Sequence, residues 1–177
     1  MKFTDEQRLI VLMLADIQKA LKIRGEFDPG FISKVAAYKE EFAIPFEHGL
    51  LFDDQDLPES FKFVINVLDM WSFIERAYEG LDAAQRQELV DRVGPRGNDP
   101  RFHGFDGNNE TELMSHCRLL VEDLHRFTEF EGRDFNSHGP MAARYREMYE
   151  LFEPMRRELL DRRKLSLDDL AKLLSIR

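Results

Sequence analysis

Helix start signals recur along the whole sequence, whereas the alternating pattern of a β-strand is nearly absent. Such a signal pairs a residue like Thr, Asp or Ser with a Gln or Asp three residues later, because each side chain bonds the other's backbone amide. An aspartate directly before proline is a second start signal. Together they predict about seven helices, near residues 5–24, 30–43, 58–79, 82–93, 109–127 and 140–163, with a short last helix opened by Ser166.

This punctuation favours an all-α chain, which we expect to form a compact multi-helix bundle as a single domain over residues 1–177. Gly25 is expected to end the first helix. Pro154 should kink or break the helix over 140–163, because proline has no amide to donate to the carbonyl of Glu150.

The first helix is apolar on more than one side, through Leu9–Leu14, Ile17 and Leu21. Such a helix is either buried at the centre of a domain or packed against the core on one side and against another subunit on the other.

Two irregular segments, 101–109 and 130–140, flank the predicted helix over 109–127. Phe102 and Phe105 are expected to plug the core, and Asp106 to cap the next helix or hold loop amides; a recognition loop that presents Asp106 is the alternative. If that helix is straight, its ends lie roughly 28 Å apart at 1.5 Å per residue, so contact between the loops is not guaranteed.

The chain carries a formal charge of −9, which makes binding to nucleic acid or to an anionic membrane unlikely. Residues 140–177 are the exception, with more basic than acidic side chains. They indicate an exposed helix or, alternatively, a docking site for a neighbouring acidic subunit. Asp53, Asp54, Asp56 and Glu59 form an acidic cluster, read as helix N-terminal charge.

Cys117 is the only cysteine, so no disulfide can form within the chain, and its place on an apolar stripe predicts a buried, inert thiol. No apolar run approaches the roughly 18 residues needed to span a membrane. Asp5 and Glu6 are unlike the basic flank of a signal peptide. A cytoplasmic location is therefore expected.

Four motifs occur in order along the chain: Thr4–Ile10, Val67–Trp71, Phe102–Asp106 and Phe135–Met141. Glu110, Arg118 and Arg126 follow the third of them. In this order and spacing the sequence resembles the YfbU family. The resemblance implies an all-helical bacterial protein that self-associates, and it implies no substrate, cofactor or catalytic residue. It gives no required role to His103, His116 or His138.

Several side chains are candidates for binding a partner or ligand. Arg118, Glu122 and Arg126 are spaced by four and should share one helix ridge, either as an exposed ion-pair row or as arginines that bind a carboxylate or phosphate. A metal site of His103, Asp106, His116 and His138 lacks helical ligand spacing and is not expected. The predicted contact residues are Asp106, Glu110, Arg118, Arg126, Asn136 and His138.

The sequence has no nucleophile elbow, Walker loop or dinucleotide fingerprint, and Gly94–Gly97 is too rigid and isolated to be a phosphate loop, so no cofactor is expected. The first hypothesis is a non-enzymatic interaction or regulatory protein that acts as a homo-oligomer or with a protein partner. The alternative is a small hydrolase or anionic-ligand-binding protein that uses the 101–109 and 130–140 loops.

Overall fold

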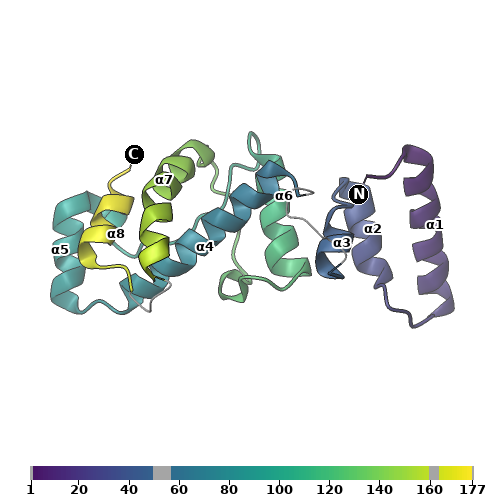
Figure 1. The fold of residues 1–177 in the computed structure, drawn as a ribbon, viewed down its shortest axis with the longest axis horizontal. Coiled ribbons are helices and arrows are strands. Elements are labelled where there is room, and N and C mark those ends of the chain that lie inside the picture. The colour runs from purple at the N-terminus through teal and green to yellow at the C-terminus, as the bar shows by residue number, and fades with distance from the viewer. Residues whose placement is uncertain (1, 50–56, 160–163, 177) are drawn as a thin grey trace. The chain divides into compact units, whose positions relative to one another are not determined.

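The computed structural model describes residues 2–49, 57–159 and 164–176. These residues form eight α-helices and no β-strand beyond one isolated bridge, which confirms the predicted all-α class. None of the described helices is long and apolar enough to cross a lipid bilayer. The chain divides into two units, Met1–Pro58 and Glu59–Arg177, coloured purple to blue and blue to yellow in Figure 1. The expectation of a single domain stays a prediction.

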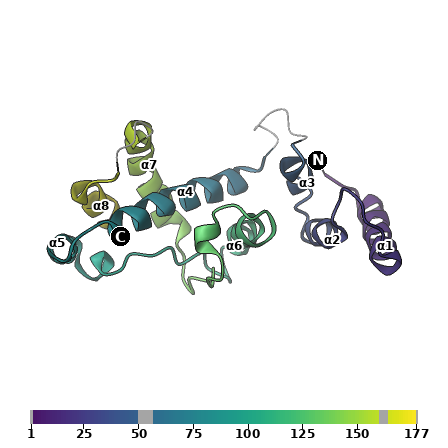
Figure 2. The ribbon, with the colours of Figure 1, turned by 90° about the horizontal axis from the view of Figure 1, so that it is seen from below.

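Unit 1 contains α1 (Asp5–Leu21), α2 (Pro29–Tyr38) and α3 (Ala43–Glu47). α1 and α2 lie side by side in Figures 1 and 2. The predicted Thr4–Gln7 capping box opens α1, and Asp28 caps α2 ahead of Pro29. Unit 1 therefore begins as a helical hairpin whose two start signals are readable in the sequence.

Two helices of unit 1 end earlier than predicted. α1 stops at Leu21 and α2 at Tyr38, where Lys22 and Lys39 take left-handed conformations with φ of 53° and 62°. The amide of Ile23 then donates back to the carbonyl of Gln18 at 3.1 Å, which completes the turn. These lysines occupy the position that glycine usually takes, so Gly25 does not end α1 as expected.

Unit 2 is built around α4 (Glu59–Glu79), which packs against α6 (Thr111–Arg118), α7 (Ala142–Leu159) and α8 (Leu167–Leu174). α5 (Ala83–Val93) and the 3₁₀ turn η2 (Gly94–Gly97) pack against α8. The Asp82–Gln85 and Ser166–Asp169 capping boxes are formed, as predicted. Ten residues of α4 are buried, so this helix is the core of unit 2.

The predicted helix over 109–127 is shorter than expected. α6 ends at Arg118 and continues only as the π-helical turn η3 (Leu119–Asp123), after which His125 and Phe127 adopt left-handed φ of 49° and 53°. The chain then turns through η4 (Thr128–Phe130). The segment after α6 is therefore free to return along the helix.

α7 continues through Pro154 to Leu159, so of the predicted kink or break, the break does not occur. Proline removes only one hydrogen bond from the helix, and its side chain is exposed here. Residues 160–163, which include the predicted end of this helix and the basic pair Arg162–Arg163, lie outside the described residues, as do Asp53, Asp54 and Asp56.

Phe102 lies at the centre of a cluster of aromatic rings in unit 2. Its ring centroid lies between 5.6 and 6.4 Å from those of five rings, which belong to Trp71, Phe105, Phe130, Phe135 and Tyr145. Phe102 is buried, as the sequence predicts.

Replacing Phe102 with alanine should lower the free energy of unfolding of unit 2 by about 3–5 kcal/mol, because it leaves a cavity among these rings. Denaturant unfolding followed by the fluorescence of Trp71, the only tryptophan, measures this loss. Leu151→Ala is the matched control, since Leu151 is 41% exposed on α7. Equal losses in the two variants would contradict the central role of Phe102.

Candidate functional site

The two predicted loops meet each other. The amide of Phe105 donates to the carbonyl of Phe135 at 2.9 Å, and the amide of Ser137 donates to the carbonyl of Phe105 at 3.1 Å, which makes an isolated parallel bridge between Phe105 and Asn136. The sequence left this contact open, because a straight helix between the loops would have kept them apart. The chain instead turns back after η3 and brings them together.

Gly104 permits this close approach. Its φ is +84°, and a Cβ added there would lie 2.0 Å from the carbonyl oxygen of Phe135. Only a residue without a side chain fits such a position. The bridge between the loops therefore depends on this one glycine.

Asp106 is buried and holds its own loop together. Its carboxylate accepts hydrogen bonds from the amide of Asn108 at 2.9 Å and from the side chain of Asn109 at 2.6 Å. These bonds, the amide of Asn108 first, lower the pKa of Asp106. The prediction that Asp106 binds loop amides is confirmed, and it does not cap α6, whose N-cap residue is Glu110.

Asn136 joins the second loop to the first. Its side-chain oxygen accepts hydrogen bonds from the amides of Gly107 and His138, both at 3.0 Å. His138 itself is exposed and has a left-handed φ of 55°. The side chain of Asn136 therefore stabilises the loop pair, whereas that of His138 faces solvent.

Glu110 connects the loops to α7. Its carboxylate accepts from the amide of Asp106 at 3.0 Å, and from the amides of Met141 and Ala142 at 3.0 and 2.8 Å. Those two amides begin α7, where backbone donors lack helical partners and where a negative charge is favoured. Glu110 thus caps a helix that starts about thirty residues further along the chain.

A further anchor was missed by the sequence reading. Arg133 forms a two-pronged ion pair with Glu75 of α4, at 2.8 and 2.7 Å, and Glu75 also accepts from the amide of Phe102 at 2.8 Å. The hydrogen bond from Glu75 raises the pKa of Arg133. Glu75 and Arg133 carry no local signal, since 57 residues separate the two within the chain.

The predicted arginine ridge is not formed. Arg118 is the last residue of α6, and Arg126 follows the π-helical turn η3, so the spacing of four no longer places Arg118, Glu122 and Arg126 on one helical face. Of the six predicted contact residues, the structure brings Asp106, Glu110 and Asn136 into one network and leaves both arginines off a common ridge.

The histidines considered for a metal are dispersed. His116 is buried on α6, where its Nε2 lies 3.2 Å from the hydroxyl of Ser60 and 3.5 Å from the carboxylate of Glu112. No group of three or more His, Cys, Asp or Glu residues in the described part of the chain is placed to hold a metal ion.

The most exposed apolar surface lies on α1. Six of its large apolar side chains are each between 50% and 66% exposed: Leu9, Ile10, Met13, Leu14, Ile17 and Leu21. They fall within one side of the helix, and Ala15 on the other side is buried. The sequence indicated an apolar helix with two faces, and the described structure of unit 1 covers only one of them.

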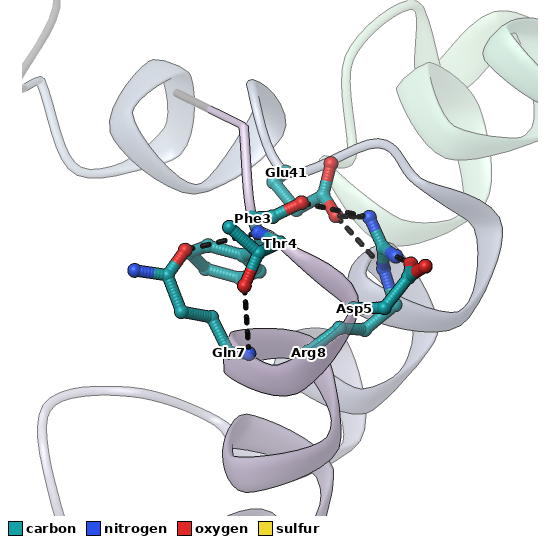
Figure 3. A network of polar contacts seen from close by, with 6 residues as sticks. All are labelled: Phe3, Thr4, Asp5, Gln7, Arg8 and Glu41. Carbon is teal, nitrogen blue, oxygen red and sulfur yellow. Dashed lines mark hydrogen bonds and ion pairs between the residues drawn. The ribbon is translucent and has the colours of Figure 1, made fainter.

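An ion pair fixes the start of α1 within unit 1 (Figure 3). The guanidinium of Arg8 donates to the carboxylate of Glu41 at 3.0 and 2.5 Å and to that of Asp5 at 2.6 Å. Glu41 is buried, and its hydrogen bond is the main cause that raises the pKa of Arg8. The covered side of α1 is thereby held, while the apolar side stays exposed.

Comparison with known proteins agrees with the resemblance indicated by the four sequence motifs. The model of the YfbU domain matches residues 1–175. The chain belongs to the YfbU family. It is also 33% identical, over 158 residues, to the UPF0304 protein MJECS11 of Methanocaldococcus jannaschii. The aligned region covers 83% of this chain and 85% of the relative. The family match extends across both units.

Replacing Gly104 with alanine should prevent the loops of this YfbU chain from pairing and cost several kcal/mol of stability, because backbone atoms cannot move aside as a flexible side chain can. Gly132→Ala is the control, with a φ of +76° but nothing within 4 Å of the added Cβ, and should cost only about 1–2 kcal/mol. Chemical denaturation compares them; a milder effect at Gly104 would contradict the bridge.

Cys117 should not react with a thiol reagent such as DTNB at pH 8 while the protein is folded. Burial is the main cause that raises the pKa of this thiol, so the reactive thiolate is not populated. One thiol per chain should react in denaturant. Fast labelling of the native protein at a rate independent of unfolding would contradict this burial.

Proposed function

We propose that this YfbU chain is a non-enzymatic, cytoplasmic interaction protein that acts as a homo-oligomer, with α1 as the contact surface. The observation that carries the proposal is the exposed apolar side of α1. Contiguous apolar surface of this kind marks a site of association in a water-soluble protein.

A second copy of the chain is the occupant that this surface suits best. From Leu9 to Ala15 the helix contains no charged residue, so two copies of it can pack around a two-fold axis without opposing like charges. The spacing of Ile10, Met13, Ile17 and Leu21 is that of a helix–helix seam. Because each chain carries a net charge of −9, surfaces of two copies outside this uncharged stretch repel each other, which favours contact through α1.

The paired loops offer less support for a small hydrolase. Hydrogen bonds that hold the loops together and cap α7 already occupy the side chains of Asp106, Glu110 and Asn136. For partner contact through this region we propose the side chains of Arg118, Arg126 and His138, which are at least partly exposed.

The double substitution Ile10→Glu/Ile17→Glu should convert the oligomer to a monomer. Each change removes about 1.5–3 kcal/mol of apolar burial and adds a charge to the contact, so association should weaken more than about a hundredfold. Light scattering coupled to size exclusion, at micromolar protein, measures the mass.

The control is Leu151→Glu, which places the same charge on an exposed leucine of α7. It should leave the mass unchanged, and both proteins should keep the helical circular dichroism of the parent. A monomeric parent, or an unchanged mass in the double variant, would sink the proposal.

A further inference from the structure

Unit 2 contains a cavity of about 240 Å³, whose lining includes Arg101 and His103 from the start of the 101–109 loop. It lies where α4, the turn after η2, α7 and α8 come together. Two prolines and a leucine form part of its wall, and the polar lining consists of Trp71, Arg96, Asn98, Asp99, Arg101, His103 and Arg144. The cavity therefore combines an aromatic ring and apolar walls with a small number of convergent polar groups, which is typical of a small-molecule site.

The cavity is positively charged, although the chain as a whole carries −9. Three arginines line it against the single carboxylate of Asp99, which lies 2.9 Å from Arg101. Arg96 and Arg144 form no ion pair within the described part of the chain. Within the described residues, Asp99 is therefore the one carboxylate that offsets the three arginines of the lining.

The same two arginines are held in place by backbone. Arg96 donates to the carbonyls of Ser175 and Ile176 at 3.5 and 3.3 Å, and the Nε of Arg144 donates to the carbonyl of Ile176 at 3.1 Å. Burial and the neighbouring charge of Arg96 lower the pKa of Arg144. The positive charge of Arg96 thus adds to burial in disfavouring the charged form of Arg144, and a bound anion would relieve both effects.

Trp71 adds a second, independent feature. It is 2% exposed, and its indole nitrogen is buried without a hydrogen-bond partner among the described residues. Buried donors are nearly always bonded to protein, water or ligand. The nitrogen itself is out of contact with the open cavity, but other atoms of the ring line it, so a ligand bound there would lie against this unsatisfied indole.

We propose that this cavity binds a small phosphorylated molecule, whose phosphate is held by Arg96, Arg101 and Arg144 beside Trp71. A phosphomonoester carries close to two negative charges near neutral pH, which balances the excess of the lining better than one carboxylate does. Forked guanidinium groups suit its oxygens. The volume admits a small body next to the phosphate, and not a large one.

The turn over Gly94–Gly97 contributes in a different way from a phosphate loop. The sequence argues against backbone amides cradling a phosphate there, and the segment forms the 3₁₀ turn η2. Its contribution to the cavity is the side chain of Arg96. The site therefore depends on guanidinium charge and not on a helix N-terminus.

The intrinsic fluorescence of Trp71 tests the proposal, because it is the only tryptophan. Titration of the full chain with glycerol 3-phosphate in phosphate-free buffer should give a saturable change, confirmed by isothermal titration calorimetry. Arg144→Gln should weaken binding by about tenfold or more, since charge-assisted bonds are lost. Arg101→Gln, at a more exposed position, gives a second reading if Arg144→Gln does not fold.

Arg157→Gln is the control, because it removes the same charge from an exposed side chain that pairs with Glu153 on α7. It should bind like the parent. The proposal is overturned if glycerol 3-phosphate causes no change up to about 10 mM. The Kd would then be well above the roughly 1 mM that corresponds to a binding free energy of about 4 kcal/mol. Two other results would also overturn it. One is that Arg144→Gln and Arg101→Gln both bind glycerol 3-phosphate as tightly as the parent does. The other is that the parent binds succinate more tightly than glycerol 3-phosphate.

Discussion

The burial of Phe102 is the interaction on which the arrangement of unit 2 depends. Its ring contacts aromatic residues of α4, of both loops and of α7, while its backbone amide bonds Glu75 on α4. One residue thus joins four segments that are distant in sequence. Because irregular segments bury few backbone bonds of their own, such a side chain supplies the apolar burial that holds them.

The helix starts could be predicted because they are local. Thr4 with Gln7, Asp82 with Gln85 and Ser166 with Asp169 are three residues apart, and each pair satisfies backbone donors without help from the rest of the chain. The ends of α1 and α2 could not, because Lys22 and Lys39 adopt a conformation that their residue type disfavours, whereas the ends of α4 and α5 fall where they were predicted. The backbone bonds that close the two turns, from Ile23 to Gln18 and from Glu40 to Val35, offset part of this cost.

The loops and the cavity show the same limit at longer range. Phe102 and Phe105 were predicted to be buried from residue type, but the bridge to Asn136 required the π-helical turn that no spacing rule indicates. Glu110 was singled out by its family motif, and its role as a distant helix cap became visible only in space. Arg96 and Arg101 follow α5, whereas Arg144 lies on α7, so the common charge of the three arginines could not be read from the sequence.

The carboxylate of Glu110 holds together the two ends of the segment that runs from α6 to the start of α7. It accepts hydrogen bonds from the amide of Asp106 before this segment and from the amides of Met141 and Ala142 after it. The ends of this segment are therefore fixed whatever happens at Gly132, where a side chain added to the glycine would meet no atom within 4 Å. Lengthening a loop with fixed ends is thermodynamically mild, at about 0.6 kcal/mol for each doubling. Unit 2 thus has a place where new sequence can be accommodated without disturbing its core.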